Sequence, residues 1–548
     1  MGKRHHIGKV LVDAAQDKSQ DQYSEGDIED ELLAIVREGR REEALRQDTR
    51  WPVLYHLSEE RQNIVSWLPL EKTDRVLEIG CGCGAVTGAL CRRAGHVDAV
   101  EISPRRAEIA AYRNQDCANL TIYVGNLNDL ALGQTYDVVT LIGVLEYAIS
   151  FTHTQKPFHD FLVQCQRYLK PGGRLVVAIE NRLGMKYWTG AFEDHTGRMY
   201  DGILGYPGVR HVRTFSRQEL AQLLREAGYA EQQWYYPYPD YKFPIDLHSD
   251  RHLPTADEMR GSFNETYDRE RVEVFSEKEA FASIVSAGLY PEFANSFLVV
   301  CGREPMDAEK LPIYVHYAWY RPAAYRLGTA IYERAGKRTV EKFARSDAAR
   351  PHLHTIEENG RILAQLYGKE HVAASHLVTS DTLVCEYVEG ESFSDYCLQA
   401  ARTDGLSGLV DALNFFAEQV VRGQEAQMAT SFDFEASGRQ YDVDLIYDNV
   451  YLQEADGYKI ADYEFLSTQR CQLFATLHAM FTFHLHHSEL WPQLGVTFDA
   501  FVNALGIEKA DWEAFLADEK SYYEYLQDWY TKRYERIRHP LQIEGITS

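Results

Sequence analysis

The segment 76-VLEIGCGCG-84 decides the fold of the first part of this chain. A run of strand length leads directly into glycines at 80, 82 and 84, which let the backbone pass close to a ligand without a clash from Cβ atoms. Four further apolar runs follow, separated by helical patterns: VDAVEI, LTIYVG, YDVVTLIG and RLVVAIEN. Strands that alternate with helices indicate parallel βαβ units, so we predict an α/β fold with a doubly wound sheet.

The composition is that of a globular protein, because 45% of the 548 residues are hydrophobic and 25% are charged. No apolar run approaches the ~18 residues that span a bilayer, and the first residues lack the apolar core of a secretory signal. Nine scattered cysteines fit reduced thiols better than a disulfide framework. We therefore expect a cytoplasmic protein without a transmembrane segment, and a peripheral position at the inner face of the membrane stays open.

The charge balance bears on the partners. The chain has 57 basic and 82 acidic residues, which gives a formal net charge of −25. Such a field repels polyanions, and the basic residues are interleaved with acids almost everywhere. These features argue against nucleic acid as a partner, whereas a neutral glycan or a small molecule is not disfavoured.

Changes in amino-acid composition along the sequence predict that the chain has three parts. Residues 1–45 are polar and form an extension with a short helix near 27–38. Residues 46–304 hold the α/β domain, with an inserted acceptor-binding region over about 181–290 that is rich in Gly, Pro, Tyr and His. The runs EQQWYYPYP and NSFLVVCG read as the closing strand pair of its sheet. Residues 305–548 form a second domain with strands first and helices after them.

The first candidate site surrounds the glycine-rich turn. Glu101 ends the second predicted strand about 20 residues after the turn, where a carboxylate can accept both hydroxyls of a ribose. Asn126 follows the third strand and could meet an adenine amino group. A dinucleotide-binding dehydrogenase is the alternative, but its G-x-G-x-x-G spacing is not met.

This set of motifs, together with GVLEY at 143–147 and LKPGG at 169–173, resembles the class I S-adenosylmethionine (SAM)-dependent methyltransferases over residues 50–304. The resemblance implies a Rossmann-like fold with SAM as cofactor. It places Glu78, Gly80, Gly82 and Gly84 around the methionine part of SAM, Glu101 at the ribose and Asn126 near the adenine. Many members carry Asp where this chain has Asn126.

The inserted region offers groups for the methyl acceptor. We predict His195 as a general base for a hydroxyl acceptor. Five basic residues nearby could instead hold an anionic acceptor: Arg182, Lys186, Arg198, Arg210 and Arg213. The alternative is that these are solvated loop residues and that His195 is a structural histidine.

The second candidate site begins with the D-L-x-x-x-N spacing of Asp444 and Asn449. Asp462 follows Asn449 by 13 residues, at the end of an apolar run. Phosphoryl transfer uses these parts: a carboxylate to orient the attacking hydroxyl (Asp444), an amide ligand for Mg²⁺ (Asn449) and a carboxylate that joins metal and phosphates (Asp462).

Residues upstream of this site fit the binding of ATP. Lys342 lies on a predicted strand and could pair with the α and β phosphates. In the helix predicted near 355–367, Glu358 lies closer to the buried face than Glu357, so we predict Glu358 as the partner of Lys342. Glu386, in the run LVCEYVEG, marks a hinge whose backbone could meet adenine.

This order resembles the protein-kinase and aminoglycoside-phosphotransferase superfamily over about residues 310–490 and implies a bilobal fold that uses ATP and Mg²⁺. The chain departs from that pattern at Val443, which replaces a basic residue, and at the triplet Asp462-Tyr463-Glu464. No glycine-rich loop precedes Lys342.

The two halves together resemble the bifunctional kinase–methyltransferases of the WbdD type, which terminate O-antigen polysaccharide chains. That resemblance implies phosphorylation of a terminal sugar followed by methylation of the phosphate, a glycan acceptor and a glycosyltransferase partner. The coiled-coil extension of that family has no counterpart here. Two alternatives stay open: a methyltransferase for a sugar or small metabolite with an inert kinase-like module, and a non-enzymatic subunit of a glycan polymerase complex.

Overall fold

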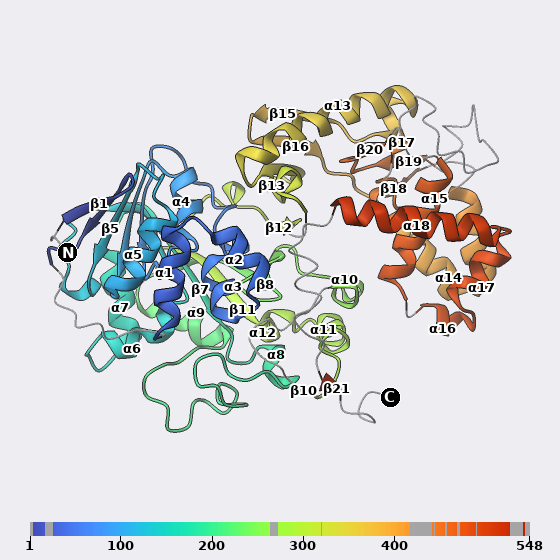
Figure 1. Cartoon of the computed structure of the whole chain (residues 1–548). Helices are drawn as coiled ribbons and strands as arrows, with labels where there is room; N and C mark the ends of the chain where they lie inside the picture. Colours follow the sequence, from blue (N-terminus) through green and yellow to red (C-terminus); the bar gives the residue numbers. More distant parts are fainter. Residues whose placement is uncertain are drawn as a thin grey trace. The chain divides into compact units, whose positions relative to one another are not determined.

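The computed structural model (Figure 1) describes residues 4–16, 26–262, 272–318, 321–416, 420, 441–442, 444–454, 457–467, 472–488, 490–526 and 541–542. Its contacts divide the chain into unit 1 (residues 1–319 with 529–548) and unit 2 (residues 320–528). The boundary therefore lies after the expected one at 304/305. The reason is that β12 (Tyr314–Tyr317) pairs with β9 (Asp246–Ser249) and so completes the sheet of unit 1.

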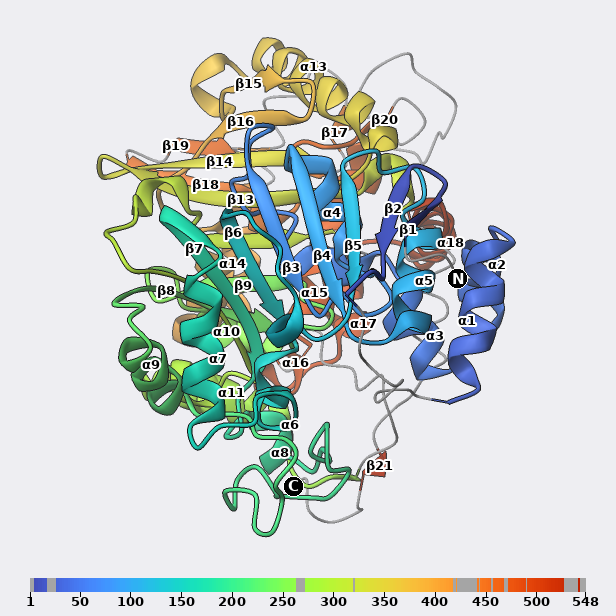
Figure 2. The same cartoon turned by 90° about the vertical axis from the view of Figure 1, so that its left-hand side faces the viewer.

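Unit 1 is built on one large sheet whose central strands are parallel, as predicted (Figure 2). The glycine-rich turn follows β3 at the middle of this sheet. In spatial order the strands are β1 (Arg4–Ile7), β2 (Val10–Asp13), β5 (Leu120–Val124), β4 (His96–Glu101), β3 (Arg75–Ile79), β6 (Tyr136–Ile142), β7 (Leu169–Glu180), β11 (Ser296–Gly302), β8 (Glu231–Tyr238), β9 and β12.

Helices bury both faces of the sheet, which explains why the strand runs are apolar throughout. One apolar core joins the strands to α7 (Pro157–Gln166), α9 (Arg217–Glu226) and α11 (Glu277–Ser286). A second core lies among α1 (Ile28–Arg37), α2 (Arg41–Gln47), α3 (Trp51–Leu57) and α5 (Pro104–Arg113). The remaining helices of unit 1 are α4 (Thr87–Arg93), α6 (Ala148–Phe151), α8 (Met185–Trp188), α10 (Ala256–Gly261) and α12 (Tyr290–Phe293).

The polar extension expected at residues 1–45 is instead part of unit 1. Strands β1 and β2 form a hairpin, and β2 pairs in parallel with β5 at the edge of the sheet. Val10 and Val12 are fully or almost fully buried there, and α1, at the place predicted for a short helix, packs on α5. A few buried side chains are enough to anchor a segment whose overall composition is polar.

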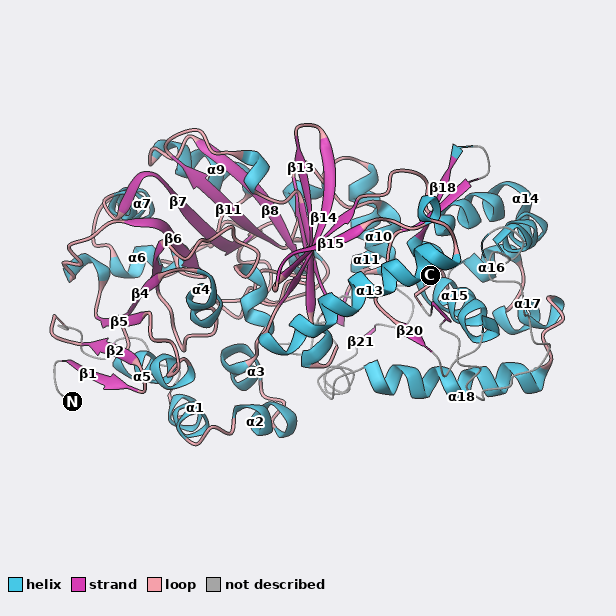
Figure 3. Ribbon diagram, turned by 90° about the horizontal axis from the view of Figure 1, so that it is seen from above, coloured by secondary structure: helices cyan, strands magenta, loops and turns pink. Residues whose placement is uncertain are grey.

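The insertion expected at 181–290 contributes strands to the sheet as well as loops. β8 and β11 pair in antiparallel fashion, which confirms the predicted closing pair, and β11 also pairs with β7 (Figure 3). The chain between α8 and α9 runs outside the sheet and carries His195. The insertion thus sets a long irregular segment beside the ends of the sheet strands.

Unit 2 starts with an antiparallel sheet in the order β13 (Leu327–Arg334), β14 (Lys337–Ala344), β16 (Thr382–Glu386) and β15 (Ser375–Thr379). The helix predicted near 355–367 is α13 (Arg350–Leu366), which begins earlier and packs on this sheet. After α14 (Phe393–Phe415) come the pair β17 (Tyr441–Asp442) and β20 (Leu466–Ser467), the hairpin β18 (Val450–Gln453) and β19 (Gly457–Ile460), and the helices α15 (Gln472–His486), α16 (Leu490–Leu494), α17 (Phe498–Ala504) and α18 (Lys509–Leu526).

Among the described residues, no helix combines the length and apolar character needed to cross a bilayer.

Candidate active site

A cavity of about 360 Å³ opens where the central strands of unit 1 end. This volume is within the usual range for sites that hold small molecules. Its lining joins residues of the glycine-rich turn to residues of the 181–290 region. Lining residues include Tyr55, His56, Arg61, Glu78, Gly80, Gly82, Glu101, Val144, Glu146, Glu180, Asp194, His195, Tyr241 and Lys242.

Glu101, the last residue of β4, lies in the cavity wall as predicted. Its Oε2 accepts a hydrogen bond from the backbone N–H of Gly82 at 2.8 Å, and its Oε1 accepts one from the N–H of Ser103 at 2.9 Å. The carboxylate therefore holds the turn after β3 and the start of α5 in place. Each oxygen keeps a second lone pair, with which a carboxylate can accept a hydroxyl.

Glu78, on β3, is only 3% exposed and lies in the same wall. Its Oε2 has no hydrogen-bond partner among the described residues. Burial raises the pKa of this carboxyl to about 7. A buried acceptor of this kind is costly unless a ligand supplies a donor, and an ammonium group would satisfy it.

The three glycines differ in their surroundings. A Cβ at Gly82 would meet nothing within 4 Å, so that this residue presents open backbone to the cavity. Gly80 lies against Val144, and Gly84 lies against Ala110 of α5, where a Cβ would approach the Ala110 Cα to 2.8 Å. Gly84 is outside the cavity lining and serves the packing of the turn on α5, which corrects its predicted place beside the cofactor.

Asn126 also lies outside the cavity lining. Its Oδ1 accepts hydrogen bonds at 2.9 Å from the backbone N–H and the side-chain amide of Asn128. The side chain thus caps its own loop, and its Nδ2 donates to the backbone oxygen of Phe151, a residue of the cavity lining, so its place near the adenine stays a prediction.

Three ionisable groups face one another at the other end of the cavity. Glu146 follows β6, Glu180 ends β7, and His195 comes from the loop after α8. His195 Nε2 lies 3.7 Å from Glu146 Oε1 and 3.8 Å from Glu180 Oε2. Burial alone would lower the pKa of His195, but the carboxylates of Glu180, Glu146 and Glu193 raise it well above its ordinary value. His195 is therefore a cavity residue, as its prediction as the base requires, and the surrounding carboxylates favour its protonated form.

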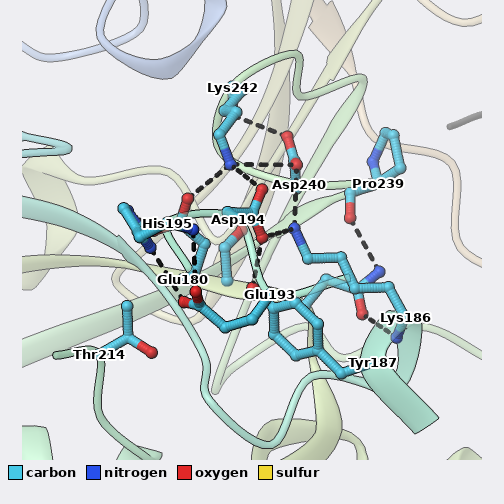
Figure 4. Close-up of polar contacts among 12 residues, drawn as sticks. Glu180, Lys186, Tyr187, Glu193, Asp194, His195, Thr214, Pro239, Asp240 and Lys242 are labelled. Carbon is cyan, nitrogen blue, oxygen red and sulfur yellow. Dashed lines mark hydrogen bonds and ion pairs between the residues drawn. The ribbon is translucent and has the colours of Figure 1, made fainter. Parts of the chain in front are cut away.

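A network of ion pairs borders this cluster (Figure 4). Lys242 Nζ lies 2.5 Å from Glu180 Oε1 and 2.8 Å from Asp194 Oδ1, while Lys186 Nζ lies 3.0 Å from Asp194 Oδ2. Burial would raise the pKa of Asp194, but the two lysines lower it well below its ordinary value. Asp240 closes the network, 3.5 Å from Lys186 and 3.8 Å from Lys242.

The basic residues predicted to hold an anionic acceptor are mostly paired with acids. Arg182 and Arg213 bind Glu219, Arg198 binds Asp201, and Lys186 belongs to the network just described. The structure therefore does not gather them into an anion site.

The sequence analysis missed Lys242, Tyr241 and Arg61 as cavity residues. A signal existed in the segment 240-DYK-242, in which an acid and a base adjoin a buried aromatic residue. Nothing local in the sequence shows that this segment folds back on the end of β7.

In unit 2, Lys342 has partners other than the predicted one. Its Nζ lies 2.8 Å from Asp462 Oδ2 and 2.5 Å from Glu464 Oε1, and Arg321 also pairs with Glu464. Glu358 is 56% exposed and pairs with Arg361 at 2.5 Å, so its predicted pairing with Lys342 is wrong. The buried face of α13 instead presents Asn359, whose side-chain amide donates to the backbone oxygens of residues 463 and 464.

Asp444, Asn449 and Asp462 lie close together. Asn449 Nδ2 donates to the backbone oxygen of Asp444 at 2.9 Å, and the N–H of Ala461 donates to the Asn449 backbone oxygen at 2.8 Å. Burial and, to a smaller extent, the carboxylates of Asp462 and Glu464 raise the pKa of the Asp444 carboxyl to about 7. The carboxylates of Asp444 and Asp462 therefore influence each other across one site.

Glu386 ends β16, where a hinge was predicted. Its backbone N–H donates to the oxygen of Ala374 at 2.8 Å, and its side chain pairs with Lys459 at 2.6 Å. The N–H of Glu386 is thus used inside unit 2, so that any adenine contact at this hinge has to involve its carbonyl or the residues that follow. Val443, noted as a departure from the kinase pattern, lies outside the described residues.

Unit 1 is similar in sequence to known methyltransferases. Residues 77–175 match the family model described as "Methyltransferase domain". The ubiquinone biosynthesis O-methyltransferase of Xanthomonas oryzae pv. oryzae is 31% identical over 157 residues, which are 28% of this chain and 61% of that protein. Its counterpart from Xanthomonas euvesicatoria pv. vesicatoria is 30% identical over 158 residues, 28% of this chain and 62% of that protein. The match thus spans about 61% of the length of the curated relatives.

Among solved structures, the N-methyltransferase NodS from Bradyrhizobium japonicum, in complex with S-adenosyl-L-homocysteine, is 15% identical with a TM-score of 0.27. The alignment covers 49% of this chain and 99% of that one. The sequence matches alone show that residues 77–175 of unit 1, which run from β3 into β7, are similar to known methyltransferase domains.

Proposed function

We propose that the class I methyltransferase domain of unit 1 binds SAM in the cavity beside β3 and transfers its methyl group to an oxygen of a sugar or a similar polar acceptor. The observation that carries this proposal is the lining of the cavity. Glu78, Gly82 and Glu101 of the predicted cofactor end and Glu146, Glu180 and His195 of the predicted acceptor end share one space.

The residues present fit SAM. Glu78 has a buried oxygen that lacks a partner within the described part of the chain and suits the ammonium group of the methionine part. Glu101 has lone pairs for the ribose hydroxyls, and the open backbone at Gly82 leaves room for the ligand. When bound, SAM supplies a sulfonium whose methyl group is open to in-line attack. The protein's contribution is to hold the two reactants in line and to exclude water.

The acceptor end has to take up a proton if the attacking oxygen belongs to a hydroxyl. His195 remains the proposed base, within a cluster in which Glu146 and Glu180 can share the proton. The surplus of carboxylates repels an anion, so a phosphate acceptor would have to enter together with a cation, whereas a neutral hydroxyl needs none.

The test is direct. Purified full-length protein should bind SAM with one site in unit 1, and sugar acceptors should yield S-adenosylhomocysteine and a methylated product. Absence of SAM binding at millimolar concentration would refute the proposal. The ubiquinone biosynthesis relatives suggest phenolic acceptors as a second acceptor class in the same assay.

We further propose that unit 2 transfers a phosphoryl group from ATP to the glycan acceptor. Lys342 beside Asp462 supports this, since such a pair orients nucleotide phosphates. Asn449 and Asp462 would hold Mg²⁺, because amide and carboxylate oxygens are the ligands it prefers. The ion neutralises charge on the phosphates when it is bound. Asp444 would orient the attacking hydroxyl.

On this proposal the two units act in turn on the end of a surface polysaccharide of the O-antigen kind, and a glycosyltransferase is the proposed partner. The first competing proposal keeps unit 2 as an inert binding module, and the second makes the whole chain an assembly subunit without catalysis. Thermal stabilisation by ATP with and without Mg²⁺, and by SAM, separates them. Stabilisation by both ligands supports the tandem enzyme, by SAM alone supports the inert module, and by neither supports the assembly subunit.

A further inference from the structure

The cluster of Glu146, Glu180 and His195 has the makings of a metal site. Each residue offers one ligand atom, and these atoms all lie within 4.8 Å of one another. The three side chains come from three different segments that meet at the ends of β6 and β7. A convergence of this kind differs from a run of acidic residues along one helix, because the fold has to bring each group in separately.

Two buried carboxylate oxygens in the cluster accept no hydrogen bond from the described part of the chain. Glu146 is 1% exposed and Glu180 is fully buried. Within the described residues, neither Glu146 Oε2 nor Glu180 Oε2 has a hydrogen-bond partner. An unsatisfied buried carboxylate oxygen is destabilising, because the hydrogen bonds that it makes with water are lost and not replaced. Two such atoms beside a cavity indicate that a ligand completes the site.

The histidine is already held as a metal ligand would be. His195 Nδ1 lies 3.0 Å from Glu193 Oε1, and Glu193 also accepts hydrogen bonds from Tyr206 Oη at 3.0 Å and from the backbone N–H of Thr196 at 2.6 Å. Metal-binding histidines commonly donate one ring N–H to a fixed carboxylate so that the other nitrogen faces the ion. Here the other nitrogen, Nε2, faces Glu146 and Glu180.

We propose that Glu146, Glu180 and His195 bind a divalent cation that also binds the oxygen of the methyl acceptor. This inference rests on the proposed methyl transfer for its purpose, but not for the existence of the site. One imidazole nitrogen and two carboxylate oxygens form a donor set suited to Mn²⁺ or Zn²⁺, and three protein ligands leave positions open for an acceptor.

The two separations from His195 Nε2 favour a metal ion over an ammonium group of the acceptor. Metal–ligand bonds of about 2.1 Å at tetrahedral angles separate the donor atoms by about 3.4 Å. Hydrogen bonds of about 2.9 Å to an ammonium ion separate them by about 4.7 Å. The separations from His195 Nε2 are 3.7 Å to Glu146 and 3.8 Å to Glu180, closer to the value for a metal.

The position of the site gives the cation a role. The three ligands line the same cavity as Gly82 and Glu101 of the cofactor end. With the cation bound, His195 Nε2 is a ligand and no longer the base. The cation would lower the pKa of a hydroxyl that it binds and hold the oxygen in a fixed direction, and Glu146 Oε2, which accepts no hydrogen bond from the described residues, would take the proton. It would also offset the carboxylates that otherwise repel an anionic acceptor, so that a sugar phosphate could enter as well as a diol.

The test is a titration of Mn²⁺ into the full-length protein, followed by the loss of the electron paramagnetic resonance signal of free Mn²⁺. All proteins in the series carry Asp462→Asn, which removes the one carboxylate among the two cation ligands proposed in unit 2, Asn449 and Asp462. We expect one bound Mn²⁺ per chain, with affinity reduced at least ~10-fold by Glu180→Gln or Glu146→Gln. Glu226→Gln, an exposed change on α9, is the matched control and should leave the affinity unchanged.

A spectroscopic signature protects the test against variants that misfold. Electron spin echo modulation from one imidazole nitrogen should be present with bound Mn²⁺ and absent in His195→Gln, each protein having first shown a normal thermal transition. Lack of Mn²⁺ binding, or binding that the three ligand variants leave unchanged, would overturn the inference. SAM binding is measured in parallel. A protein that binds SAM but does not bind Mn²⁺ refutes the cation site alone. A protein that binds Mn²⁺ but does not bind SAM refutes the proposed function alone.

Discussion

Replacement of Glu464 by Gln should destabilise unit 2 far more than replacement of Glu358 by Gln. Glu464 and Lys342 are almost fully buried, with 7% and 6% of their side chains exposed, and they lie 2.5 Å apart. Arg321 shares the same carboxylate. The substitution removes the negative charge that Lys342 and Arg321 share. Among the ion pairs described, Asp462 is then the carboxylate partner that Lys342 keeps.

The magnitude follows from the burial of this pair. Breaking a buried ion pair by removal of one partner costs about 3–5 kcal/mol, and we take about 3 kcal/mol because Gln keeps one hydrogen-bond acceptor. For a unit of about 200 residues each kcal/mol shifts the melting temperature by about 2–4 °C, so the expected fall is about 6–12 °C. The Glu358–Arg361 pair is exposed and is worth about 0–1 kcal/mol.

Differential scanning calorimetry of the full-length variants measures both shifts, and limited proteolysis identifies the unit that melts first. Glu358→Gln has the same chemistry and serves as the control for loss of a carboxylate. Equal shifts in the two variants, or a larger shift for Glu358→Gln, would contradict the larger contribution expected from the buried Glu464–Lys342 pair.

Three further predictions concern the sites themselves. Glu101→Gln should weaken SAM binding by about 10–100-fold in calorimetry. Both carboxylate oxygens accept hydrogen bonds from backbone N–H groups, and the amide NH₂ of Gln would point a donor at one of those N–H groups at a cost of about 1–3 kcal/mol. Unaltered affinity would contradict this. The pKa of Glu78 is raised from 4.5 to about 7 in the folded state, so its contribution to stability is full below pH 4.5 and is lost as pH rises through 7. Glu78→Gln should therefore raise the melting temperature at pH 8 but not at pH 4.5. The same gain at both pH values would refute the assignment. Asp444→Asn should lower ATP-dependent phosphorylation of a glycan acceptor at least ~100-fold while SAM affinity stays at the wild-type value, and unchanged phosphorylation would remove Asp444 from the chemistry.

Local sequence patterns predicted the features of this protein that depend on neighbouring residues. The strand, the glycine-rich turn and the acidic residue at the end of the next strand follow from residues 76–101, and β3, β4 and Glu101 occupy the expected places. Parallel strands align their carboxyl ends at one edge of the sheet, so that such short motifs also fix where a cavity opens.

Features that depend on distant residues escaped prediction. A helical wheel ranks Glu357 and Glu358 by the helix alone, whereas Lys342 meets Glu464 from a segment 122 residues further on. Lys242 reaches Glu180 across 62 residues. Buried charges have few local signals, because each is tolerated only when its partner arrives from elsewhere in the fold.

The pairing of β2 with β5 has a consequence for folding of the chain during its synthesis on the ribosome. Val10 to Asp13 pair with the adjacent β1, but their second neighbour is available only when residues 120–124 have been made, about 110 residues later. At a translation rate of about 5–20 residues per second this delay lasts roughly 5–20 seconds, during which one edge of β2 is unpaired and exposed to solvent. A growing chain of this protein is therefore most exposed to mispairing, or to capture by a chaperone, before its fifth strand emerges.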